Sequence, residues 1–140
     1  MAAWTSLDHT ADLELEATGD TPERCLEELC AGLLAQVTAP EAVQPERAVE
    51  LEAGGFDAAE TLVSALGELL FWLNARGWVF RRCEALEVTP TQIRLRAWGE
   101  PRDPDRHPFD LEVKAATYHE LLFGPAPEGT GWRMRVLFDV

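Results

Sequence analysis

Acidic side chains near the N-terminus are spaced so that they could bind a metal ion. Asp8 and Asp12 stand four residues apart around His9 and Thr10, just before a segment with strand periodicity. Carboxylate oxygens are the ligands that Ca²⁺, Mg²⁺ and Mn²⁺ prefer, and side chains on loops held by a rigid scaffold often bind ligands. Aspartate and threonine also form local turns with the backbone. The cluster is therefore compatible with a cation site or with an ordinary turn.

The C-terminal residues offer a second set of anionic oxygens. Apolar side chains alternate with mostly polar ones from Trp132 to Val140, which predicts a strand that runs to the last residue. Asp139 and the carboxylate of Val140 would then be adjacent ligands for the same hard cations. The alternative is a frayed terminus beside a surface aspartate.

Lys114 is the only lysine in a chain with twelve basic residues. The compact, titratable ammonium of lysine is not interchangeable with the planar guanidinium of arginine. A lone lysine in a predicted strand could therefore have a specific function. A chance lysine on a solvated strand face is the alternative.

The other reactive side chains form no catalytic pattern. The three histidines have no triad partner at a recognisable spacing, and most are expected to be structural: His9, His107 and His119. The three cysteines match no metal or redox spacing and are expected in the core: Cys25, Cys30 and Cys83. No P-loop, dinucleotide-binding, zinc-protease or nucleophile-elbow motif occurs.

The chain is strongly acidic. Twelve basic and 25 acidic residues give a net charge of −13, which opposes binding to phosphate backbones and to anionic lipid. We therefore expect no direct nucleic-acid binding and no membrane association. An acidic surface suits a cation or a basic protein partner, and charge that only maintains solubility is the alternative. No export signal is recognisable, so we expect a cytoplasmic protein.

Periodicity and capping signals predict a single domain over residues 1–140 with the element order βαβαββββ. Thr21 followed by Pro22 is expected to open one amphipathic helix, and Asp57 with Glu60 a second helix, which Gly77 ends. Strands are predicted at 12–18, 48–53, 78–88, 92–99, 110–123 and 132–140. Early helices and late antiparallel strands indicate an α+β fold, with two helices packed on a mostly antiparallel sheet.

Three segments resemble the archease family. The run from Leu7 to Asp12, continuing through Gly19 to Glu23, is similar to the family's opening signature. Val113 to His119 resembles its VKAxTY segment, and Val136 to Val140 resembles its hydrophobic ending in aspartate plus an aliphatic residue. The similarity covers the whole chain.

The resemblance implies an α+β fold and a bound divalent cation, calcium in the family, with Mn²⁺ or Mg²⁺ also possible. It implies metal ligands at Asp12, Asp139 and Val140, and it aligns Lys114 with the family's functionally important lysine. Asp8 and His9 belong to the opening signature and are expected to contribute to activation of the partner.

The partner that the resemblance implies is the GTP-dependent RtcB-type RNA ligase that seals tRNA exons. An archease promotes guanylylation and multiple turnover of that ligase and is not itself an enzyme, so it would meet tRNA only through the ligase. The alternatives are a metal-dependent hydrolase and a chaperone-like protein-binding module that needs no metal.

Overall fold

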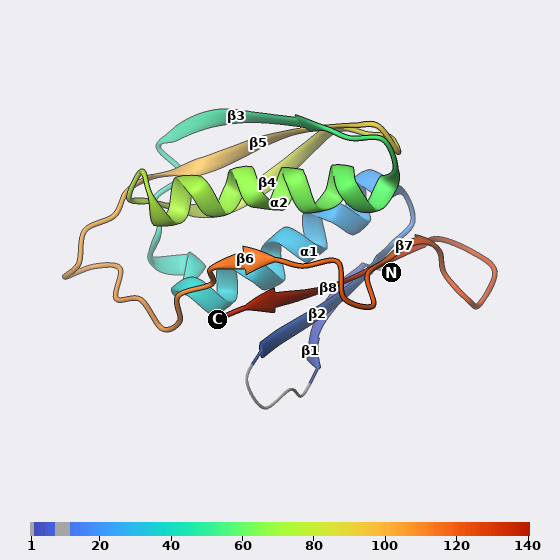
Figure 1. The fold of residues 1–140 in the computed structure, drawn as a ribbon. Coiled ribbons are helices and arrows are strands. Elements are labelled where there is room, and N and C mark those ends of the chain that lie inside the picture. The colour runs from blue at the N-terminus through green and yellow to red at the C-terminus, as the bar shows by residue number, and fades with distance from the viewer. Residues whose placement is uncertain (1, 8–11) are drawn as a thin grey trace.

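Two helices lie between two antiparallel sheets, as Figure 1 shows. The computed structural model describes residues 2–7 and 12–140. The elements in chain order are β1 (Ala3–Leu7), β2 (Asp12–Gly19), α1 (Pro22–Val37), the 3-10 turn η1 (Pro40–Ala42), β3 (Arg47–Gly54), α2 (Ala58–Asn74), β4 (Trp78–Val88), β5 (Gln92–Pro101), β6 (Ala115–Ala116), β7 (Leu122–Pro125) and β8 (Trp132–Asp139). One sheet has the order β1-β2-β8-β6, with β7 also paired to β8, and the other has the order β3-β5-β4.

Both helices begin where their capping residues predict. The Thr21 hydroxyl accepts a hydrogen bond from the backbone N–H of Arg24 at 3.0 Å, and Asp57 accepts one from the N–H of Glu60 at 2.9 Å. These bonds satisfy N–H groups that have no partner inside a helix. The Glu60 carboxylate accepts from the N–H of Phe56 at 2.9 Å, so the return bond reaches the residue before the cap.

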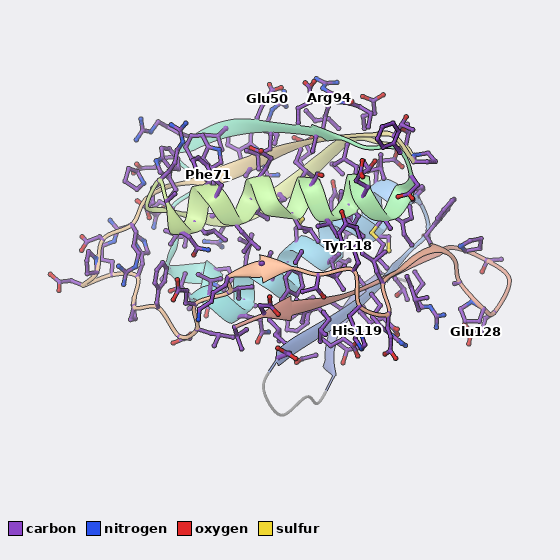
Figure 2. All side chains as sticks on the ribbon, in the orientation of Figure 1. Glu50, Phe71, Arg94, Tyr118, His119 and Glu128 are labelled. Atoms are coloured by element: carbon purple, nitrogen blue, oxygen red, sulfur yellow. The ribbon has the colours of Figure 1, made fainter. Side chains whose placement is uncertain are left out.

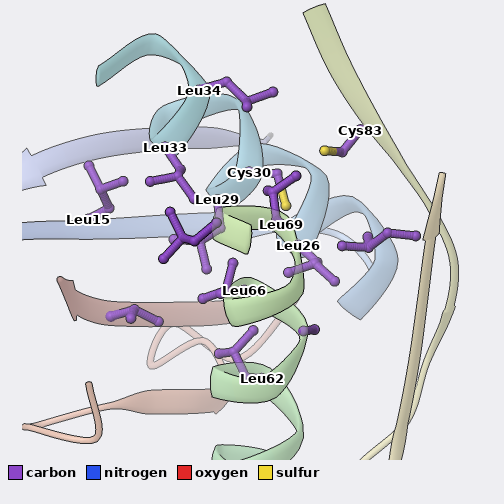
Figure 3. Packing of buried hydrophobic residues seen from close by; sticks show 14 of the residues in the cluster. Leu15, Leu26, Leu29, Cys30, Leu33, Leu34, Leu62, Leu66, Leu69 and Cys83 are labelled. Atoms are coloured by element: carbon purple, nitrogen blue, oxygen red, sulfur yellow. The ribbon is translucent and has the colours of Figure 1, made fainter. Parts of the chain in front are cut away.

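The core forms where α1 is enclosed between the two sheets. Figure 3 shows leucines of α1 and α2 packed together with side chains of both sheets. Each fully buried leucine contributes about 1.5–3 kcal/mol relative to an exposed one. The largest fully buried side chains of the two helices are Leu26, Leu29, Leu33, Leu34, Leu62, Leu66, Leu69 and Leu73.

The predicted α+β class is confirmed, and the structure adds a strand and divides the sheet in two. Residues Ala3–Leu7 form β1, which pairs with β2 and was not predicted. Its five residues lack a clear alternation, and its pairing with β2 is a contact that a local pattern does not reveal. Trp4 packs so closely against Gly32 of α1 that its ring atoms would lie 2.9–3.0 Å from a Cβ atom there.

The prediction of one strand over residues 110–123 was wrong. Only the short strands β6 and β7 occur there. The N–H of Asp110 donates to the carbonyl of Val37 at 2.9 Å, and the Asn74 amide donates to the carbonyl of Val113 at 2.9 Å. Because these backbone groups bond to the ends of the helices, they do not join a strand ladder. Glu120, with φ at 51°, turns the chain before β7.

Candidate functional site

The pairing of β2 with β8 places Asp12 directly opposite Asp139. The next pair along the ladder, Leu13 and Phe138, is 7% and 0% exposed and faces the core. Side chains alternate between the two faces of a strand, so both aspartates lie on the outward face of the five-stranded sheet. Facing residues of an antiparallel pair have Cβ atoms about 5 Å apart, close enough for both carboxylates to share one cation.

The charges along this outward face follow a simple pattern. Four pairs along the ladder and on the same face, Glu16 stands opposite Arg135 and forms an ion pair with it at 2.9 Å. At the end of the strands, Asp12 stands opposite another carboxylate instead. Opposite charges across a ladder are favourable and like charges are unfavourable. The Asp12–Asp139 pair is therefore the position on this ladder where a bound cation would relieve repulsion.

Strand β6 holds the backbone of Asp139 from its other side. The N–H of Lys114 donates to the carbonyl of Asp139 at 2.8 Å, and Ala115 stands opposite Asp139. The N–H and the hydroxyl of Thr117 both donate to the carbonyl of Leu137, at 2.9 Å each. The last residues of β8 are thus fixed between two strands, which positions Asp139 rigidly.

The remaining predicted site residues are placed as follows. Val140 is half-buried and packs against the core, so its apolar side chain anchors the end of β8. Lys114 is exposed and lines a groove between α2 and β6. Asp8 and His9 lie outside the described residues.

Glu14 is a buried carboxylate on the same face, and its burial was not predicted from the sequence. It lies two residues beyond Asp12 and is 5% exposed, opposite Leu137 at 7%. The alternation of β2 predicts a solvated side chain there, and no local signal indicates the burial.

The donor set fits a hard cation. Within residues 2–7 and 12–140, no three His, Cys, Asp or Glu side chains are grouped as a complete metal site. Asp12 and Asp139 supply two carboxylates, and oxygen ligands of this kind suit Ca²⁺, Mn²⁺ or Mg²⁺. The carboxylate of Val140 and water would have to complete the coordination.

A second polar cluster surrounds Glu100 at the end of β5. Its carboxylate accepts hydrogen bonds from the N–H of Gln44 at 2.8 Å, from Nε2 of His107 at 3.0 Å and from the guanidinium of Arg106. His107 Nδ1 accepts from the N–H of Asp103 at 2.8 Å, so Nε2 carries the proton. Burial alone would raise the pKa of Glu100, but the three hydrogen bonds outweigh it and lower that pKa. This network joins two loops, which confirms a structural role for His107.

The cysteines are confirmed as buried free thiols of the core. Cys25 donates to the carbonyl of Ala17 at 3.4 Å. Burial raises the pKa of Cys25 to about 12, so its thiol stays protonated and is a poor nucleophile. A hydrogen bond with Cys83, together with burial, also raises the pKa of Cys30. These side chains contribute packing.

Comparison with known proteins places this chain and its fold in one family. Residues 4–140 match the family model described as the archease protein family (MTH1598/TM1083). The chain is 42% identical over 121 residues to Protein archease of Methanopyrus kandleri. The alignment covers 84% of this chain and 86% of that protein. It is 32% identical to Protein archease of Pyrococcus abyssi over the full length of both.

The fold agrees with that class. The solution structure of Methanobacterium thermoautotrophicum Protein 1598 superposes with a TM-score of 0.76 at 24% identity and covers 99% of each chain. The chain belongs to the archease family. Among the described residues, no helix is long and apolar enough to cross a membrane.

Proposed function

We propose that this chain is a divalent-cation-binding accessory protein that activates the GTP-dependent RtcB-type RNA ligase of tRNA splicing. Membership of the archease family supports the class. The observation that carries the proposal is the ladder pair Asp12–Asp139, whose second member is held by the backbone N–H of Lys114. Segments that are distant in sequence thus meet at one end of the five-stranded sheet.

In this proposal the carboxylates of Asp12, Asp139 and Val140 hold the cation at the sheet edge. When bound, the cation, which is Ca²⁺ by resemblance or else Mn²⁺ or Mg²⁺, supplies positive charge that can orient the phosphates of a nucleotide. Asp12 and Asp139 contribute by facing each other on rigid strands, so little motion is needed for both to bind. Lys114 contributes a compact ammonium close to the same edge and contacts the partner.

The chemistry belongs to the ligase in this proposal, and the archease is not an enzyme. Burial raises the pKa of Cys25 and keeps its thiol protonated, and His107 is enclosed in a structural network. Asp8 and His9 would assist activation from the segment that precedes β2. A surface with a net charge of −13 repels RNA, so tRNA would be bound by the ligase alone. Buried free thiols are typical of a reducing compartment, which supports a cytoplasmic location.

The test is multiple-turnover ligation. The purified chain is added in sub-stoichiometric amount to the cognate ligase with GTP, Mn²⁺ and a broken tRNA, and products per ligase are counted. We expect several products per ligase with the chain and about one without it, since an activator must act catalytically on its client. Unchanged turnover would contradict the activator function, and GTP hydrolysis by the isolated chain would contradict the non-enzyme assignment.

A metal-dependence control separates the proposal from a metal-independent chaperone-like module. Asp12→Ala and Asp139→Ala are assayed beside the wild type at increasing Mn²⁺. Activation that is lost at low Mn²⁺ and partly restored at high Mn²⁺ supports the cation site. Full activation by both variants at every concentration would favour the metal-independent module.

A further inference from the structure

A groove of about 360 Å³ runs between the C-terminal half of α2 and strand β6. Its walls are mainly apolar, from Gly67, Leu70, Phe71 and Ala116, and Lys114 lines it from the start of β6. The Phe71 ring is 50% exposed at the end of α2, where Figure 2 labels it. The groove is thus an apolar depression on the surface with an ammonium group beside it.

Gly67 leaves a recess in this groove that the fold does not require. A Cβ atom built on Gly67 would have no atom within 4 Å, so no neighbouring group demands a glycine there. Glycine in a helix interior costs about 1 kcal/mol relative to alanine. A residue that lowers stability and is not needed for internal packing is expected where something outside the chain approaches the helix.

Two cationic side chains lie at the groove, because Lys114 lines it and Arg76 stacks on Phe71, which also lines it. The guanidinium of Arg76 lies 5.5 Å from the ring centre of Phe71 and 4.8 Å from that of Trp72. Among the residues that the structure describes, neither Arg76 nor Lys114 has a carboxylate within ion-pair distance, although acidic residues outnumber basic ones by 25 to 12. Arginine beside exposed aromatic rings is typical of protein-binding surfaces.

We propose that this groove is the docking site for an acidic segment of the protein partner, with an apolar side chain of that segment in the recess at Gly67. Carboxylates that flank the apolar anchor would meet Arg76 and Lys114. The inference rests on the proposed function, because it takes the partner to be the RNA ligase. It separates two roles, since Asp12 and Asp139 lie on the outward face of the sheet and the groove lies between β6 and α2.

The first test fills the recess. Gly67→Trp places a ring in open space, so the fold should survive, which circular dichroism checks. Gly124→Trp is the matched control, because a Cβ atom at Gly124 also has no atom within 4 Å and β7 does not line the groove. We expect Gly67→Trp to weaken binding to the ligase about tenfold or more, as for loss of an interface anchor. Gly124→Trp should bind like the wild type.

The second test addresses charge and contact. Arg76→Glu should weaken the complex as strongly, whereas Arg94→Glu should not, because Arg94 lies on the three-stranded sheet away from α2 (Figure 2). Replacing Phe71 with photoreactive p-benzoylphenylalanine should crosslink the chain to a ligase peptide rich in Asp and Glu, identified by mass spectrometry.

The outcomes distinguish this inference from the proposed function. A ligase that neither binds nor responds to the wild-type chain would overturn both. Activation by the wild type together with unchanged binding of Gly67→Trp and Arg76→Glu would overturn the docking site alone. A crosslink to a basic peptide or to tRNA would also overturn the docking site and leave the activator function intact.

Discussion

Neutralising Asp139 should have opposite effects on stability with and without a divalent cation. Asp139→Asn keeps the shape of the side chain and removes one of the two facing charges at the end of the β2–β8 ladder. Without metal, the change relieves repulsion between Asp12 and Asp139. With metal, it removes an anionic ligand. The change in stability should therefore be positive without metal and negative with metal.

The magnitudes follow from the strand register. Cross-strand charge pairs are worth about 0.2–1 kcal/mol, so the metal-free variant should be more stable by roughly 0.5 kcal/mol. For a chain of this length 1 kcal/mol corresponds to about 3 °C in Tm, which predicts a rise of about 2 °C. A cation at a hundred times its Kd stabilises the wild type by about 2.7 kcal/mol. A tenfold weaker Kd would reduce that gain to about 1.4 kcal/mol. After the gain from relieved repulsion is subtracted, the net loss is about 0.8 kcal/mol, so the variant should then melt about 2 °C below the wild type.

The assay is thermal unfolding followed by circular dichroism, in EDTA and in a Ca²⁺ or Mn²⁺ series. Asp105→Asn is the matched control, because it removes the same charge from an exposed loop and should respond to metal like the wild type. A variant that melts below the wild type in EDTA would refute the repulsion argument. An equal metal-induced shift in Asp139→Asn and wild type would remove Asp139 from the cation site.

Three further changes test other parts of the structure. A short neutral peptide added after Val140 should weaken Ca²⁺ binding in calorimetric titration, whereas the same peptide before Met1 should not, and equal affinity of both forms would exclude the terminal carboxylate. The pKa of Glu100 is lowered in the folded chain, so this group stabilises the fold above its unfolded pKa and that contribution is lost as the pH falls through the lower folded pKa. In urea unfolding, the advantage of wild type over Glu100→Gln should therefore shrink as the pH drops from 7 toward 3, and a constant difference would contradict the network. Gly67→Ala should raise Tm by about 3 °C, from roughly 1 kcal/mol of helix propensity; a lower Tm would show that the fold needs glycine there.

Local signals in the sequence were sufficient for the elements whose stability depends on nearby residues. Helix caps at Thr21 and Asp57 act within one turn, so the starts of both helices could be predicted. The hairpin of β4 and β5 connects neighbouring segments, and it was predicted for the same reason. Asp12, Asp139 and Lys114 were also named as candidate site residues from the sequence, by residue type and by family resemblance, and their role stays a prediction.

Tertiary structure decided which of these residues meet. The sequence predicts that Asp12 and Asp139 lie in strands, but only the β2–β8 register places them opposite each other. A shift of one residue would turn one of them toward the core, and such a register depends on how all buried side chains fit together. Local patterns contain no information on that fit.

The same limit explains the segment between β5 and β8 and the groove. Residues 110–114 bond to the ends of both helices instead of forming a strand, because those distant backbone groups compete with strand pairing. Gly67 and Lys114 are far apart in the chain and line one groove only after α2 and β6 have packed. The sequence by itself therefore determined both helices, most of the strands and the candidate residues, whereas long-range packing decided which carboxylates face each other and which residues line the groove.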